Sequence, residues 1–364
     1  MRAIRGACAL TPEGWTGPVE LVVDDAGQID GLRPTAGTVP DVALVPGFVD
    51  LQVNGHDDID VAVAEGADWD RLDGLLVAQG VTTWCPTLVT APLGAYPAAL
   101  ARIARAAGRD GVRPTIAGAH LEGPFLGGQA GAHPIEHLRA VDAGWLAELP
   151  PIVKVVTLSP EVTGVAAGIA ALRDRGALVA LGHSAASYEE AEAAVDAGAR
   201  LVTHCFNASG ALHQRAPGFL GAALSDDRLA VSLIADLTHV HPALLRLAFR
   251  AKGAGGVALV TDAVAWRAGH AGAIAVSVDD DGVPRLPDGT LAGSALTMQQ
   301  AIRNLVREAG VELADAVAAA ATTPARLLGL HDRGALERGR RADVVALTAD
   351  EAVAGTWIGG ERQR

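Results

Sequence analysis

Lysine and cysteine are both scarce in this sequence of 364 residues. The three cysteines, Cys8, Cys85 and Cys205, are odd in number and far apart, which argues against a disulfide framework and favours a reducing compartment. No run of about 18 apolar residues occurs, so we expect no membrane-spanning helix. The first residues lack a sustained apolar segment, and we expect no secretory signal. Together these absences predict a cytoplasmic protein.

Positive charge is also limited. Lys154 and Lys252 are the two lysines, arginine supplies the remaining basic side chains, and the formal net charge is -13. An acidic chain repels nucleic acids and anionic membranes, so we expect neither as a partner. A small anionic substrate would therefore need a local cationic pocket on this protein.

Strand-like and helix-like segments alternate between about residue 45 and residue 262. With segment 45–53 as the first, there are eight predicted strands, most of them followed by a helix. This alternation favours an α/β fold with a parallel sheet, and eight units favour a (β/α)8 TIM-like barrel. Both ends of the chain are rich in short strands and turns. We predict that residues 1–45 and 335–364 form one small β-sandwich domain and residues 46–334 the barrel, with segment 134–148 mostly helical.

Four predicted strands end in a side chain that can bind a metal or carry a proton, namely Glu122, His183, His204 and Asp262. Residues two apart share one face of a strand, so His120 is expected to emerge with Glu122. In a (β/α)8 barrel the C-terminal strand ends meet at one rim, where catalytic groups from several strands gather. Glutamate, histidine and aspartate are the usual ligands and base of a hydrolytic metal site.

A single histidine or glutamate near a strand end is more often structural than functional. The metal-site prediction therefore depends on convergence, because four such residues would face one centre. Four further histidines could be ligands too, but each is more typical of a solvated loop or helix position, and we assign none of them to the site: His56, His213, His241 and His270.

Motifs are spread along most of the chain. They include Pro46-Gly47-Phe48-Val49-Asp50, His120-Leu121-Glu122-Gly123-Pro124, Gly182-His183-Ser184, Thr203-His204-Cys205-Phe206-Asn207-Ala208, Val260-Thr261-Asp262-Ala263 and Gly293-Ser294-Ala295-Leu296-Thr297-Met298. In these motifs the chain resembles the amidohydrolase superfamily and, within it, the N-acetylglucosamine-6-phosphate deacetylase branch. The Glu-Gly-Pro and Gly-Ser-x-Leu-Thr-Met elements are specific to that branch, whereas the tail at 339–347 is common to the superfamily.

The resemblance implies a metal-dependent hydrolase. Glu122, His183 and His204 would hold one divalent metal ion per subunit, with zinc expected and iron(II), cobalt(II) or manganese(II) as alternatives. Asp262 would be the catalytic base that takes a proton from the attacking water and passes it to the departing amine.

A second metal is not expected to bind tightly. Many relatives carry a His-x-His pair at the end of the first strand, and Gln52 and Asn54 stand at those places here. A neutral amide is a weak zinc ligand beside imidazole. Whether a weak second ion binds near Gln52, Asn54 and His56 stays open.

The resemblance also implies substrate contacts. His133 would stabilise the tetrahedral oxyanion, Asn207 and the Ala208 amide would hold a sugar phosphate, and His239 would make a further contact. Arg215 would reach the phosphate bound to the neighbouring subunit, which implies a homodimer with shared sites. An arginine fork suits phosphate geometry.

The function implied is hydrolysis of the acetamide of N-acetylglucosamine 6-phosphate to glucosamine 6-phosphate and acetate. The chain departs from the usual pattern at Ser209-Gly210 and at Leu237-Thr238. These departures fall in segments that would bind the substrate and leave the residues of the hydrolytic centre unchanged. The alternatives are N-acetylgalactosamine 6-phosphate, an unphosphorylated N-acyl compound, or a non-catalytic scaffold of the same fold. Retention of all three metal ligands counts against the scaffold.

Overall fold

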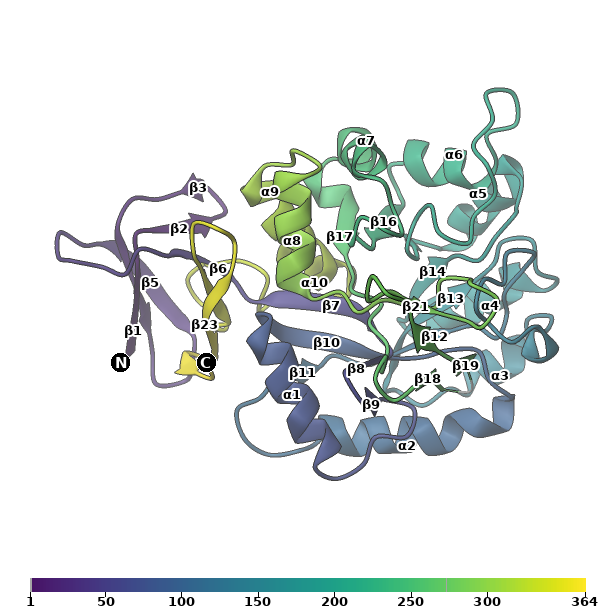
Figure 1. The fold of residues 1–364 in the computed structure, drawn as a ribbon, viewed down its shortest axis with the longest axis horizontal. Helices are drawn as coiled ribbons and strands as arrows, with labels where there is room; N and C mark the ends of the chain where they lie inside the picture. The colour runs from purple at the N-terminus through teal and green to yellow at the C-terminus, as the bar shows by residue number, and fades with distance from the viewer. Residues whose placement is uncertain (1, 273) are drawn as a thin grey trace.

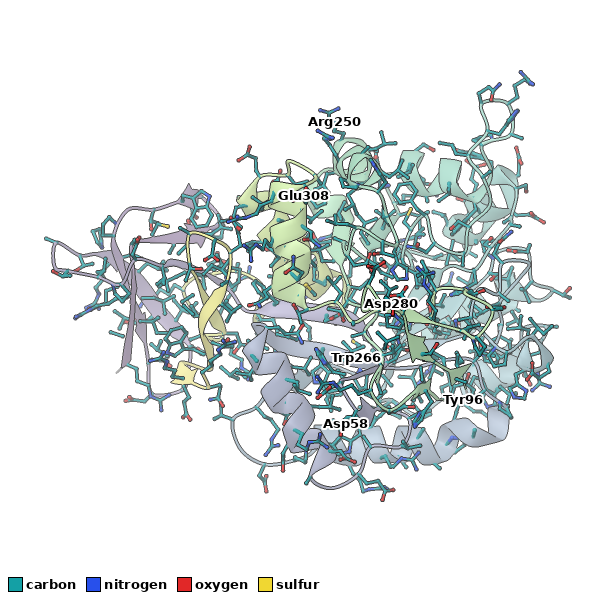
Figure 2. All side chains as sticks on the ribbon, viewed as in Figure 1. Asp58, Tyr96, Arg250, Trp266, Asp280 and Glu308 are labelled. Carbon is teal, nitrogen blue, oxygen red and sulfur yellow. The ribbon has the colours of Figure 1, made fainter. Side chains whose placement is uncertain are left out.

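The structure is a computed structural model that describes residues 2–272 and 274–364, and it consists of a barrel unit and a smaller β unit (Figure 1). Both chain ends lie in the β unit, coloured purple and yellow at the left of the view. The helices surround the strands of the barrel unit, and Tyr96 on α2 and Arg250 on α7 lie on opposite sides of it in this view (Figure 2). No described helix has the length and apolarity that crossing a bilayer requires.

Parallel strands form the barrel, which confirms the predicted (β/α)8 architecture. In the described chain they are β7 (Phe48–Val53), β10 (Val81–Leu88), β12 (Ala119–Glu122), β13 (Val153–Leu158), β14 (Leu178–Leu181), β15 (Leu201–Val202), β16 (Ala230–Leu233) and β17 (Val257–Leu259). A short β11 (Thr115–Ile116) pairs beside β10. The last strand approaches the first just beyond its end, where Asp262 N–H donates to Gln52 O at 2.9 Å.

A helical segment follows each barrel strand. These segments are α1 (Asp68–Ala78), α2 (Tyr96–Ala107), α3 (Ala143–Ala147), α4 (Val165–Asp174), α5 (Tyr188–Ala197), α6 (Gly218–Ser225), α7 (Pro242–Lys252), and then α8 (Met298–Arg307), α9 (Leu313–Val317) and α10 (Thr323–Leu327). Single turns add η1 (Leu93–Ala95), η2 (Ile135–His137) and η3 (Ala254–Gly256), and the π-helical turn η4 (Ala318–Thr322) joins α9 to α10. Apolar faces of these helices pack on the strands as one buried core.

The segment 134–148, predicted to be mostly helical, is not one continuous helix. That stretch contains η2 and the short α3, with extended chain between them. In the extended part, Arg139 N–H donates to Pro124 O at 3.2 Å and Val141 N–H donates to Thr163 O at 2.9 Å. Backbone groups that bond to neighbouring loops cannot also bond within a helix, so tertiary contacts outweigh the local helix propensity.

The β unit contains two sheets from both ends of the chain, as predicted. One sheet has the order β1 (Arg2–Gly6), β4 (Val19–Val23), β5 (Ile29–Pro34), and the other has the order β24 (Glu361–Arg362), β23 (Val353–Ile358), β22 (Val344–Leu347), β6 (Ala43–Pro46), β2 (Cys8–Thr11), β3 (Gly14–Trp15). Side chains of both sheets share one apolar core, with Leu21, Leu44 and Val344 among its buried members. The boundaries 1–45 plus 335–364 and 46–334 stay a prediction.

The chain enters the barrel at Gly47. Segment 45–53, expected to be one barrel strand, is divided, because β6 ends at Pro46 in the small unit and β7 begins at Phe48 in the barrel. A Cβ atom on residue 47 would lie 2.4 Å from Thr82 Oγ1. Glycine therefore permits the backbone to pass close to the Thr82 side chain at the point where β6 ends and β7 begins.

An insertion between β17 and α8 covers part of the barrel mouth. It contains two short antiparallel pairs, β18 (His270–Ala271) with β19 (Ile274–Ala275) and β20 (Ser277–Val278) with β21 (Pro284–Arg285). Its apolar side chains, including Val264, Ile274 and Ala292, form a cluster of their own. A hairpin of β8 (Gly55–His56) and β9 (Ile59–Asp60) follows β7.

Candidate active site

Three buried side chains meet where β12, β14 and β15 end. Glu122 Oε1 lies 3.1 Å from His183 Nε2 and 2.8 Å from His204 Nε2. The two imidazole Nε2 atoms are 3.1 Å apart. Each residue is at most 4 % exposed. The convergence expected of these three residues is therefore present in the fold.

The electrostatics of this cluster favour an ionised carboxylate facing two imidazoles. Burial by itself would raise the pKa of Glu122, but the close contacts with His183 and His204 outweigh it and lower that pKa well below its ordinary value. Burial likewise opposes the charged form of His204, yet the Glu122 carboxylate raises the His204 pKa overall. Two imidazole nitrogens that face one carboxylate oxygen are an arrangement that a cation stabilises.

Asp262 lies beside the cluster and is held by two amides. Its Oδ1 accepts from Asn54 Nδ2 at 2.7 Å and from Gln52 Nε2 at 3.1 Å, and Gln52 Nε2 also lies 2.9 Å from Glu122 Oε1. Burial, followed by the nearby Glu122 charge, raises the pKa of Asp262 to about 8. The side-chain amides of Gln52 and Asn54 thus orient the carboxylates.

The backbone is strained at several of these residues. His183, His204 and Asp262 have φ angles of 52°, 32° and 50°, a region that L-residues other than glycine rarely adopt and that costs about 1–2 kcal/mol each. Such strain persists where surrounding structure holds it, and it gathers at functional sites. The sequence contained no signal for it, because none of the three residues is a glycine.

His133 closes one side of the site. Its Nε2 lies 3.7 Å from Glu122 Oε2, and its Nδ1 lies 2.8 Å from Thr90 Oγ1. Burial, reinforced by the nearby His183, lowers the pKa of His133 to about 3. The potential ligand atoms of Glu122, His133 and His183 all lie within 4.8 Å of one another. Distance alone therefore leaves His133 open as a ligand or as a hydrogen-bond donor.

His120 has a structural environment. It emerges on the same strand as Glu122, but its Nδ1 lies 3.1 Å from Leu51 O and its Nε2 lies 2.8 Å from Thr157 Oγ1. Burial lowers its pKa to about 4. Both ring nitrogens are therefore used inside the barrel, below the site.

A cavity of about 320 Å³ opens above the cluster. The insertion supplies apolar lining residues that include Val264, Ala271 and Ile274, and the loops after β15 and β16 supply Asn207, Ala208 and His239. Among the described residues that line it, none is a lysine or an arginine. An anionic group in this cavity would meet no cationic side chain of the same subunit apart from histidine.

The residues expected to contact the substrate have different hydrogen-bond partners. His239 is fixed by Asp236, whose Oδ2 lies 2.6 Å from His239 Nδ1. Asn207 donates to His204 O at 3.1 Å, and Ser184 N–H donates to Ala208 O at 3.0 Å. Asp236 was given no role from the sequence; its position three residues before a cavity histidine was the available signal.

Arg215 lies away from this cavity. It is exposed on the loop between β15 and α6, which projects from the barrel at the upper right (Figure 1). That loop carries an antiparallel bridge between His213 and Ala216. Arg215 does not reach the cavity of its own subunit.

Residues 43–362 match the amidohydrolase family. The chain belongs to the amidohydrolase family. Among relatives, an N-acetylgalactosamine-6-phosphate deacetylase of Escherichia coli O157:H7 is 37 % identical, with 98 % of each chain covered. An N-acetylglucosamine-6-phosphate deacetylase of Danio rerio is 39 % identical over 95 % of this chain and 89 % of its own.

A solved structure of this family has the same fold. It is an N-acetyl-D-glucosamine-6-phosphate deacetylase mutant from Mycobacterium smegmatis in complex with N-acetyl-D-glucosamine-6-phosphate, with a TM-score of 0.91, 32 % identity and coverage of 99 % of this chain and 98 % of that chain. The resemblance drawn from the motifs is therefore confirmed, and so is the class of enzyme, an amidohydrolase.

Proposed function

We propose that this amidohydrolase removes acetate from N-acetylglucosamine 6-phosphate to give glucosamine 6-phosphate. The observation that carries the proposal is the buried cluster of Glu122, His183 and His204 with Asp262 beside it. The similarity to deacetylases of amino-sugar phosphates supports the substrate class.

A single divalent cation, with zinc as our proposal, fits the donor set. Glu122, His183 and His204 would hold it, because one ionised carboxylate and two imidazole nitrogens converge within 3.1 Å of one another. When bound, such an ion polarises the amide carbonyl and makes water more acidic. Iron(II), cobalt(II) and manganese(II) accept the same donors, and metal analysis of the purified protein distinguishes them.

Asp262 would move the proton. With Gln52 and Asn54 holding one oxygen, the carboxylate is placed to accept a proton from water as the C–O bond forms. It would then deliver that proton to the nitrogen as the C–N bond breaks, since a neutral amine is the better leaving group. Acetate and the free amino sugar are the products.

His133 would donate to the carbonyl oxygen as negative charge develops there. We assign Asn207, the Ala208 amide and His239 to the sugar phosphate, because all three line the cavity above the cluster. Asp236 would fix the ring of His239 through the 2.6 Å contact.

The phosphate would be neutralised from a second subunit. The cavity lacks lysine and arginine among its described lining residues, while Arg215 projects from the barrel on an exposed loop. We therefore propose a homodimer in which Arg215 of each chain reaches the neighbouring site. Leu212, which is 55 % exposed on the same loop, would lie in that contact. The three cysteines are unpaired, which supports our proposal of a cytoplasmic location.

Acetate release from a panel of sugars tests the function. We expect turnover of N-acetylglucosamine 6-phosphate to exceed that of N-acetylgalactosamine 6-phosphate and of unphosphorylated N-acetylglucosamine. Preference for the galactosamine epimer would instead favour the activity named for the E. coli relative. Equal rates with and without phosphate would contradict the phosphate pocket, and an inert, metal-free protein would identify a scaffold.

A further inference from the structure

Two histidines at the site differ at Nδ1, where one faces a hydrogen-bond acceptor and the other faces a donor. Nδ1 of His183 lies 3.1 Å from the backbone oxygen of Gln129. Nδ1 of His133 lies 3.3 Å from the backbone nitrogen of Thr90 and 2.8 Å from its Oγ1. Both rings have Nε2 directed at Glu122, so the difference between them lies at Nδ1.

The partner of His183 requires a proton on Nδ1. A carbonyl oxygen can accept a hydrogen bond but cannot donate one. His183 therefore carries N–H at Nδ1, and in the neutral ring the lone pair is at Nε2, which is the atom that meets Glu122. This is the tautomer that a metal-binding imidazole needs.

The partner of His133 requires the reverse. A backbone N–H can donate but cannot accept, so the Thr90 amide needs a lone pair on His133 Nδ1. The Thr90 hydroxyl has one proton and can direct it to the same nitrogen at 2.8 Å in place of the backbone oxygen of Glu122 at 3.3 Å. In the neutral ring the proton is then on Nε2, and a nitrogen that carries a proton cannot bind a metal.

Thr90 is built into the site. It lies two residues after the end of β10, it is fully buried, and its hydroxyl also lies 3.3 Å from the backbone oxygen of Glu122. Gly123 follows Glu122, and a Cβ atom at position 123 would lie 2.3 Å from Thr90 Oγ1. Glycine at 123 thus leaves the space that the threonine side chain occupies beside His133.

We infer that Thr90 is a positioning residue that holds His133 as a neutral donor through Nε2–H and thereby keeps it out of the metal ligand set. Proximity places His133 among the potential ligand atoms, and the donor at Nδ1 decides between the two roles. The use of this donor at the oxyanion rests on the proposed function, whereas the tautomer itself does not.

Histidine ¹⁵N NMR of the zinc-loaded protein tests the tautomer without any assay. With the His133 signals assigned from a His133→Gln variant, we expect Nε2 of His133 protonated and Nδ1 unprotonated, with His183 showing the reverse and a zinc-bound Nε2. A protonated Nδ1 or a zinc-bound Nε2 at His133 would overturn the inference. An inert protein that shows the expected tautomers would support it while contradicting the proposed activity.

Thr90→Val and Thr90→Ser test the contribution of the hydroxyl. Valine keeps the shape and the backbone amide but loses one of the two donors, so we expect kcat to fall about tenfold with little change in KM. Serine should restore most of kcat. Normal kcat in the valine variant, with unchanged His133 signals, would contradict a positioning role. Since the NMR measurement uses the unaltered chain, the inference stays testable if the valine variant folds poorly.

Discussion

The buried cluster at the strand ends and the exposed loop before α6 are built in opposite ways. In the cluster, Glu122 faces two imidazoles, Asp262 is held by two amides, and strained φ angles are maintained by the surrounding structure. In the loop, Arg215 and Leu212 are exposed. One subunit thus contains the buried carboxylates and imidazoles of the cluster, whereas no lysine or arginine is among the described residues that line its cavity.

Replacing Glu122 should have the largest effect. Glu122→Gln keeps the size but removes the ionised oxygen that faces both imidazoles, so we expect loss of bound metal and a fall in kcat/KM of at least about a thousandfold. Elemental analysis and acetate release measure both. Glu189→Gln, on the exposed side of α5, is the matched control. Retained metal in Glu122→Gln would remove this residue from the ligand set.

Asp262→Asn should separate proton transfer from metal binding. The amide cannot take the proton of water, so we expect kcat to fall about a hundredfold to ten-thousandfold while the metal content stays at the wild-type value. If kcat survives, the base has been assigned to the wrong residue. If metal is lost instead, Asp262 is a ligand and the cluster is larger than three residues.

Arg215→Ala, on the exposed loop before α6, should weaken binding of the phosphorylated sugar. We expect KM for the phosphorylated sugar to rise about tenfold to a hundredfold, because a charged hydrogen bond is lost, with little change for an unphosphorylated sugar. Steady-state kinetics on both sugars test this. Arg250→Ala, on the exposed side of α7, controls for loss of one surface charge, and an unchanged KM in Arg215→Ala would leave the phosphate without its proposed partner.

Mixing Arg215→Ala with Glu122→Gln tests whether Arg215 acts across subunits, because each variant alone should have low activity at low substrate concentration. In a dimer of one Arg215→Ala chain and one Glu122→Gln chain, the Arg215→Ala chain keeps its metal ligands and would receive the intact arginine of its partner. We expect the mixture to regain activity at low concentrations of the phosphorylated sugar. No recovery in confirmed mixed dimers would mean that Arg215 acts within its own chain or not at all.

The smallest effect concerns stability of the metal-free protein. The pKa of Asp262 is raised to about 8, above its value of about 4 in an unfolded chain. Its contribution to the free energy of unfolding is therefore fully present in acid and is lost as the pH rises through about 8. With chelator present, the Tm of Asp262→Asn should exceed that of wild type at high pH by an amount that shrinks toward acid. The largest gap corresponds to on the order of a few kcal/mol. A gap independent of pH would contradict the raised pKa.

The sequence predicted the barrel and the composition of its centre from patterns that are local. Strand-helix alternation identifies parallel units, and the C-terminal ends of parallel barrel strands meet at one rim whatever the connecting loops do. For that reason the pattern of residues was enough to expect Glu122, His183, His204 and Asp262 at one centre. The roles of His133 and the substrate residues depended on resemblance to a family.

Other features were decided by contacts between distant segments. The helix expected at 134–148 gave way to backbone bonds with neighbouring loops, and segment 45–53 was divided between two sheets at Gly47. The Thr90 amide that meets His133 and the aspartate that fixes His239 were likewise unassigned from sequence.

The amino-acid sequence by itself determined which chemical groups stand at the ends of the strands. Tertiary structure alone decided which nitrogen of each histidine faces a donor and which faces an acceptor. The physical reason is that side-chain alternation is a property of a single strand, whereas a tautomer depends on a partner brought close by folding, as Thr90 is to His133 and Gln129 is to His183.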